Sequence, residues 1–157
     1  MTIVFDLDGT LMDTLQDLWL STNYALRTHN MAERSIKEVR QFVGNGVHKL
    51  IERAVPEETS NEMIEKVFAT FKEHYVIHCQ EHTDLYPGIK ELLVQLKKEG
   101  HSLAVVSNKL QSGVDELHHN FFNDTIDVAI GERAGIPRKP APDMVILALR
   151  ELEERGV

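Results

Sequence analysis

Two aspartates stand two positions apart directly after a short apolar run at the N-terminus. Ile3-Val4-Phe5 leads into Asp6-Leu7-Asp8-Gly9-Thr10. Such a run is typical of a buried strand, so we expect both carboxylates in the loop where this strand ends. Two carboxylates in one loop can divide nucleophilic attack and proton transfer between them. The pair is therefore the first candidate for a reactive centre.

Two later segments carry polar residues in matching positions. Ser107-Asn108-Lys109 follows the apolar run 103–106, and Arg138-Lys139-Pro140 lies in a segment rich in proline. In an open parallel sheet, ligands bind beyond the carboxyl ends of the strands. Together the three segments supply two acids, a hydroxyl, backbone N–H groups at a helix start and a cation. This set can hold and transfer a phosphoryl group.

The elements that must position these residues fall into two kinds. From residue 14 to residue 82 the apolar spacing is helical, with one helix expected near Leu15 to Thr22 and a long one through Ile64 to Tyr75. Capping-box patterns at Ser35 and Thr59 mark two helix starts. This stretch is predicted to be an inserted, all-helical cap domain.

The rest of the chain alternates between strands and helices. Helices are expected from Ile89 to about Gly100, from Lys109 to about His119 and after Pro142, the last with Val145, Ala148, Leu149 and Leu152 inward. Strands are expected at 103–106 and 126–130. The fold class is therefore α/β, with a parallel-sheet core formed by 1–13 and 83–157 and the cap by 14–82.

Composition narrows the class of partner. The 157 residues are 42% hydrophobic and 27% charged, with a formal net charge of −8. This charge argues against nucleic acid or an anionic membrane surface as a partner. The single cysteine, Cys79, fits a reducing compartment, and no apolar run reaches the roughly 18 residues of a membrane span. We expect a cytoplasmic protein.

The three polar segments resemble the motifs of the haloacid dehalogenase superfamily. Residues 5–14 look like its first motif, 105–109 like its second and 138–143 like its third. The likeness covers essentially the whole chain and implies a Rossmann-like core with an inserted cap. Within the superfamily, 43–46 and 85–88 are most similar to phosphoglycolate phosphatases and related small-substrate phosphatases. The resemblance implies Mg²⁺-dependent hydrolysis of a small phosphorylated metabolite.

The resemblance also implies roles for individual residues. Asp6 is the expected nucleophile, which forms an aspartyl-phosphate, and Asp8 the general acid and base. Mg²⁺ is expected on an Asp6 carboxylate oxygen and the Asp8 main-chain carbonyl. The residues expected to contact substrate are Gly9, Thr10, Ser107, Asn108 through its backbone, Lys139 and, in the cap, Gly44, Asn45 and Gly46.

Plainer readings compete at several positions. Ser107 and Asn108 could cap a helix, and Lys139 could be an ordinary loop residue. Lys109 could contact substrate or face solvent, and 44–46 could be a simple turn. His74, His78 and His82 recur every four residues; packing is favoured over a zinc site there.

One family feature is missing from the sequence. The superfamily's fourth motif, an acidic pair after a further strand that completes the Mg²⁺ site, is not found before Val157. We therefore expect that the last part of the core is missing and that an exposed sheet edge favours self-association. Two alternatives to the phosphatase stay open. One is an impaired pseudo-phosphatase that binds phosphate or serves in assembly, and the other a phosphosugar mutase or nucleotidase of the same superfamily.

Overall fold

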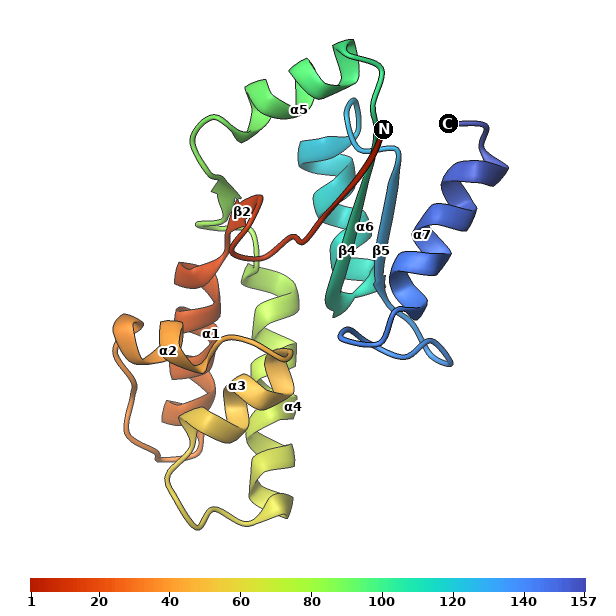
Figure 1. Cartoon of the computed structure of the whole chain (residues 1–157). Helices are drawn as coiled ribbons and strands as arrows, with labels where there is room; N and C mark the ends of the chain where they lie inside the picture. The colour runs from red at the N-terminus through yellow and green to blue at the C-terminus, as the bar shows by residue number, and fades with distance from the viewer. The chain divides into compact units, whose positions relative to one another are not determined.

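A three-stranded parallel sheet forms the centre of the α/β unit. The computed structural model describes residues 1–157 of the chain. The strands are β1 (Thr2–Phe5), β4 (Ser102–Leu110) and β5 (Val128–Glu132), in the order β1-β4-β5 (Figure 1). The expectation of a parallel α/β core is confirmed.

The central strand β4 supplies side chains to both faces of the sheet. Leu103 and Val105 belong to one buried cluster, whereas Ala104 and Val106 belong to another. Successive side chains of a strand point to opposite faces, and here both faces are covered. This explains why the strand is continuously apolar rather than alternating.

Helices cover the two faces unequally. α5 (Ile89–Lys98), α6 (Gln111–Leu117) and the π-helical turn η1 (His118–Phe122) pack on the face of Leu103. α7 (Asp143–Glu154) packs on the opposite face beside β5 (Figure 1). The unit therefore has three layers, helix on sheet on helix.

Two details of this unit differ from the sequence-based expectation. β4 continues to Leu110, so α6 begins at Gln111 rather than at Lys109. In α7, Ala148 and Leu152 are buried as expected, but the third buried residue is Met144, whereas Leu149 is 45% exposed. Residues 144, 148 and 152 form one row along the helix, and 145 and 149 form the neighbouring row. Both rows are apolar, so only the position of the sheet decides which of them faces it.

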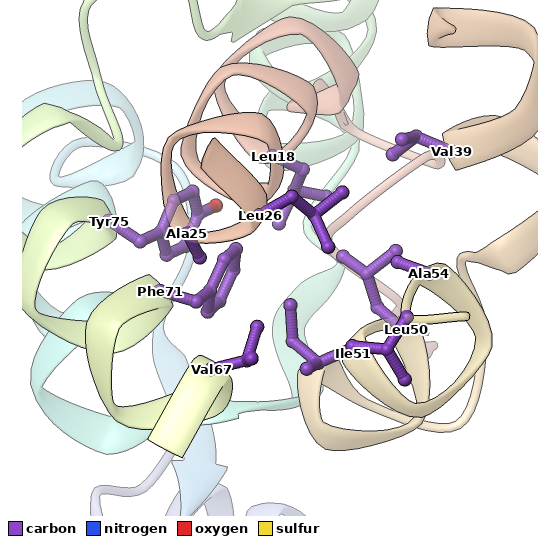
Figure 2. Packing of buried hydrophobic residues seen from close by; sticks show 11 residues of the cluster. Leu18, Ala25, Leu26, Val39, Leu50, Ile51, Ala54, Val67, Phe71 and Tyr75 are labelled. Atoms are coloured by element: carbon purple, nitrogen blue, oxygen red, sulfur yellow. The ribbon is translucent and has the colours of Figure 1, made fainter. Parts of the chain in front are cut away.

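The helical unit consists of four helices with a core of their own: α1 (Leu15–Thr28), α2 (Ile36–Phe42), α3 (Val47–Ala54) and α4 (Asn61–His78). Figure 2 shows side chains of α1, α3 and α4 pointing toward one another, among them Leu26, Ile51 and Phe71. These three are fully buried, as the helical spacing of apolar residues requires.

Two helix starts in this unit carry side-chain caps. The Ser35 hydroxyl accepts from the Glu38 N–H and the Glu38 carboxylate accepts from the Ser35 N–H, so the predicted capping box is present. The second predicted cap is wrong by one residue. Ser60, not Thr59, caps α4, by accepting from the Met63 N–H.

The chain divides into two compact units, Met1–Met12 with Leu85–Val157 and Asp13–Asp84. The sequence-based expectation puts the helical part at 14–82. The boundary passes through β2 (Met12–Asp13) and β3 (Asp84–Leu85), which pair in a two-stranded sheet. None of the helices is long and apolar enough to cross a membrane.

Candidate active site

The loop after β1 is anchored by leucines and exposes its aspartates. Leu7 and Leu11 are each 1% exposed, and the Leu11 N–H donates to the Leu7 carbonyl at 3.0 Å. Between them the Asp8 side chain is 27% exposed, and just before them the Asp6 side chain is 49% exposed. The buried anchors fix the backbone, so both carboxylates stand at the carboxyl end of β1 within reach of solvent.

Gly9 is needed in this loop for its backbone conformation. Its φ is +78°, in the left-handed region, and a Cβ built there would meet nothing within 4 Å. The Gly9 N–H donates to the Met12 carbonyl and the Thr10 N–H to the Leu7 carbonyl. Both N–H groups therefore close the turn, and the Thr10 hydroxyl lies 3.5 Å from Asp6 Oδ2.

The Lys139 ammonium reaches Asp6 from a distant part of the chain. Lys139 Nζ donates to Asp6 Oδ1 at 2.9 Å and to the Val106 carbonyl at 2.8 Å. Val106 precedes Ser107 on β4, so the ammonium sits where β1 and β4 meet. This contact brings residues of the first, second and third motif regions together.

The second aspartate has its own lysine. Lys109 Nζ lies 3.5 Å from Asp8 Oδ1, and the Lys109 side chain is only 10% exposed. A Cβ built on Gly113 would lie 3.5 Å from the Lys109 Cγ and Cδ atoms, so the lysine stem runs along this helical glycine. The reading of Lys109 as a solvent-facing residue is therefore wrong.

Ser107 is buried beneath these charges. The residue is 2% exposed, and its Oγ accepts from the Lys109 N–H at 3.1 Å. That bond uses an acceptor lone pair and leaves the hydroxyl proton to be donated elsewhere. Ser107 to Lys109 lie where the register between β4 and β5 shifts, rather than at a helix start. The predicted helix N-terminus at this point is therefore wrong.

The site combines two ammonium groups with two carboxylates in a chain whose net charge is −8. The lysines therefore supply the local positive groups that an anionic substrate would need. At short range and low solvent exposure their attraction exceeds that of distant surface charges, which salt screens over roughly 10 Å.

The candidate substrate loop 44–46 lies in the helical unit, between α2 and α3. Gly44, Asn45 and Gly46 all have positive φ, at +127°, +66° and +89°. Arg53 holds the loop by donating to the carbonyls of Phe42 and Gly44, each at 2.9 Å. Three successive positive φ values explain the glycines. A contribution of this loop to substrate selection stays a prediction.

The histidines of α4 serve packing and hydrogen bonding. The His74 ring stacks on Tyr24 and on His78, with centroids 4.2 and 4.1 Å apart, and its Nδ1 lies 2.8 Å from the Ser21 hydroxyl. Burial, with a smaller contribution from the charge of His78, lowers the pKa of His74 below its ordinary value. No group of three metal-binding side chains occurs in the chain. Packing therefore accounts for His74. The His78 side chain is 41% exposed and pairs with Glu81. His82 lies beyond the end of α4, so the expected run of three histidines along one helix is wrong.

Comparison with known proteins shows to which family this chain is related. The family model described as haloacid dehalogenase-like hydrolase matches residues 3–155. The chain belongs to this family. The phosphoglycolate phosphatase of Aquifex aeolicus is 32% identical over 153 residues, covering 97% of this chain and 70% of that protein. The Aliivibrio fischeri phosphoglycolate phosphatase is 30% identical over 147 residues, covering 89% of this chain and 65% of that protein.

The solved structures agree with the sequence relatives. A protein of Lactobacillus delbrueckii subsp. bulgaricus, assigned as a phosphoglycolate phosphatase, matches with a TM-score of 0.88 and 32% identity. The match covers 98% of this chain and 72% of that one. The haloacid dehalogenase-like hydrolase thus spans about two thirds of the length of its curated relatives, and their common fold is confirmed.

The sequence pointed to most of the residues that meet in the α/β unit of this hydrolase. It did not indicate that the Asn108 carboxamide hydrogen-bonds to the backbone of Lys139, because the expected roles of Asn108 were a backbone contact with substrate or a helix cap. It left Lys109 undecided. The one available signal was polar residue types at strand ends, and this signal does not specify which side chains pair.

Proposed function

We propose that this chain carries the site of a Mg²⁺-dependent phosphatase that acts on a small phosphorylated metabolite of the phosphoglycolate type. The observation that carries the proposal is the Lys139 ammonium, 2.9 Å from the Asp6 carboxylate at the carboxyl edge of the sheet. A carboxylate nucleophile beside a fixed cation suits attack on a phosphate dianion. The names and the identity of the relatives favour the phosphoglycolate-type substrate.

In the first step an oxygen of the Asp6 carboxylate forms a bond to phosphorus while the bond from phosphorus to the substrate's ester oxygen breaks. Asp8 in its protonated form gives its proton to the departing alkoxide. Lys139 attracts the non-bridging oxygens, whose charge would otherwise repel the nucleophile. Ser107 donates its hydroxyl proton to one of those oxygens.

In the second step water attacks the phosphorus of the aspartyl-phosphate. Asp8, now ionised, takes a proton from that water, and the bond between phosphorus and the Asp6 oxygen breaks. Inorganic phosphate leaves, and both aspartates return to their starting protonation states. Lys109, 3.5 Å from Asp8 Oδ1, steadies the ionised form that exists between the two steps.

The oxygen donors of the β1 loop fit a magnesium ion in chemical type. Mg²⁺ prefers oxygen ligands and usually binds through one or two carboxylates together with waters and substrate phosphate. Asp6 would provide a carboxylate oxygen and Asp8 its main-chain carbonyl. When bound, the ion would reduce the repulsion between carboxylate and phosphate and polarise the phosphoryl oxygens.

Phosphate release tests this proposal directly. Wild type and Asp6→Asn would be assayed on a panel of small phosphomonoesters that includes phosphoglycolate, with Mg²⁺ present. Asp124→Asn is the matched control, because Asp124 is an exposed acid of the turn before β5. We expect Asp6→Asn to abolish release and the acid-stable phosphoenzyme, and Asp124→Asn to match wild type. Equal rates of phosphate release for Asp6→Asn and wild type would refute the assignment of Asp6 as the nucleophile.

A phosphate-binding protein without turnover is the second candidate. The observation in its favour is that the structure places no group of three metal-binding side chains together. Calorimetric titration with Mg²⁺ separates the two. Binding at millimolar or lower concentration, lost in Asp6→Asn, supports the phosphatase, whereas phosphate binding without Mg²⁺ binding supports the alternative.

The remaining expectations concern surroundings and substrate choice. We expect loop 44–46 to help select the substrate, and a mutase or nucleotidase of the same family would differ in this loop. A cytoplasmic location is expected from the single cysteine, Cys79. Fractionation of cells that express the tagged full-length gene product would test the location.

A further inference from the structure

The carboxamide of Asn108 binds both backbone groups of Lys139. Its Nδ2 donates to the Lys139 carbonyl at 3.1 Å, and its Oδ1 accepts from the Lys139 N–H at 2.9 Å. The two residues are 31 positions apart: Asn108 lies near the C-terminal end of β4, and Lys139 lies in the loop between β5 and α7. One side chain thus ties a long loop to the central strand.

This attachment acts on the residue whose ammonium touches Asp6. Lys139 Nζ donates to Asp6 Oδ1 and to the Val106 carbonyl, so its side-chain end is held by groups of β1 and β4. Its backbone end is held by Asn108 alone among the side chains. The loop that carries Lys139 extends from 133 to 142 without strand or helix. Two other backbone hydrogen bonds, Ile136 N–H to the Arg133 carbonyl and Ala141 N–H to the Arg138 carbonyl, are internal to the loop, and only its last residue, Pro142, accepts a backbone hydrogen bond from α7.

We propose that Asn108 is a positioning residue, whose side chain fixes the Lys139 backbone so that the ammonium stays at Asp6 Oδ1. The inference rests on the proposed function, in which Lys139 neutralises the phosphoryl oxygens. A lysine reaches its target through four rotatable bonds, so a shift of its backbone changes where the ammonium lies. A misplacement of about 1 Å at a reacting centre can cost about a hundredfold in rate.

The helical unit contains a matched pair that separates positioning from stability. Asn23 makes the same two bonds to one residue: Nδ2 donates to the Arg34 carbonyl at 2.9 Å, and Oδ1 accepts from the Arg34 N–H at 2.8 Å. Asn23 is 5% exposed and belongs to α1, not to the candidate site. Replacing either asparagine with alanine removes two comparable hydrogen bonds, but only Asn108 is joined to Lys139.

A double-mutant cycle tests the proposal. Asn108→Ala, Lys139→Ala and the double variant would be compared with wild type for kcat/KM on para-nitrophenyl phosphate and for the affinity of inorganic phosphate by calorimetry. We expect Asn108→Ala to lower both by about tenfold to a hundredfold and Lys139→Ala to lower them further. The double variant should be no worse than Lys139→Ala, since Asn108 acts through that lysine.

The outcomes separate this inference from the proposed function. If Lys139→Ala leaves phosphate affinity and rate unchanged, the role of Lys139 and with it the proposed function are wrong. If Lys139→Ala is impaired but Asn108→Ala equals wild type, or if the two losses multiply, only the positioning role is wrong. Asn23→Ala should lose stability in urea and keep kcat/KM within about twofold; a loss equal to that of Asn108→Ala would also overturn positioning.

A second variant guards against misfolding. Asn108→Ser keeps a polar side chain, but its hydroxyl is too short to bind both backbone groups of Lys139. If Asn108→Ala lacks the wild-type far-UV circular dichroism spectrum, Asn108→Ser replaces it in the cycle. A folded Asn108→Ser with wild-type phosphate affinity and rate would contradict the proposal.

Discussion

Substitution of Gly131 by alanine should disrupt the packing of β5 against the end of β4, where the second-motif region lies. A Cβ at this position would lie 2.7 Å from the Gln111 Cα, 2.7 Å from the Lys109 carbonyl oxygen and 2.8 Å from Val114 Cγ2. Ordinary Cβ contacts are longer than 3.4 Å. Two of the three crowded atoms are backbone, so no rotation of a side chain can relieve the overlap, and β5 must move away from the start of α6.

The expected cost follows from these contacts. Overpacking a buried site typically costs about 1–3 kcal/mol, and overlap with fixed backbone puts this case at the upper end. The Gly131 N–H also donates to Gln111 Oε1 at 2.6 Å, and loss of that bond would add about 1 kcal/mol. We therefore expect the free energy of unfolding to fall by about 3–4 kcal/mol, a decrease in Tm of about 10 °C.

Gly113→Ala is the control, since it makes the same change two residues beyond Gln111. A Cβ there would lie 3.5 Å from the Lys109 stem, which is ordinary contact, and alanine favours a helix over glycine by about 0.5–1 kcal/mol. Urea denaturation followed by far-UV circular dichroism would measure both variants. We expect opposite signs. A Gly131→Ala protein as stable as wild type, or equal losses in both variants, would refute the reasoning.

Three further predictions concern the helical core, pH and the sheet edge. Phe71→Ala should cost about 3–5 kcal/mol of unfolding free energy in urea, because Phe71 is fully buried, whereas Val76→Ala, at a side chain 68% exposed, should cost less than about 0.5 kcal/mol. Because the pKa of His74 is lowered in the folded state, the unfolded chain binds a proton at this residue more readily than the folded chain does. The contribution of His74 to the free energy of unfolding should therefore be fully present above about pH 6.5 and be lost as the pH falls through the pKa of the folded state. His74→Gln should make urea stability less dependent on pH between 7 and 5, and an unchanged slope would contradict this. Because β1 is an edge strand and Val4 is 36% exposed, the chain should associate at high concentration and Val4→Lys should reduce association in sedimentation velocity; a wild type that stays monomeric would argue against it.

Much of this fold could be predicted from local sequence. The spacing of apolar residues depends on neighbours within four positions, so it located the helices of 14–82 and the strand at 103–106 before any packing was known. The cap at Ser35 followed from residue types three apart, and all its atoms lie within one helical turn. Even here the predicted cap of α4 was wrong by one residue, Thr59 instead of Ser60, because adjacent threonine and serine are nearly equal as N-caps.

The sequence by itself determined that acids, a hydroxyl and lysines would gather at one edge of a parallel sheet, because the strand ends are visible as apolar runs followed by polar residues. Only the tertiary structure decided which of them pair. Asp6 and Lys139 are 133 positions apart, and Asp8 and Lys109 are 101 positions apart. Such contacts depend on how strands align and loops close, so no local pattern encodes them. The same holds for Asn108, whose residue type gave no sign that its side chain binds the backbone of a loop beyond the next strand.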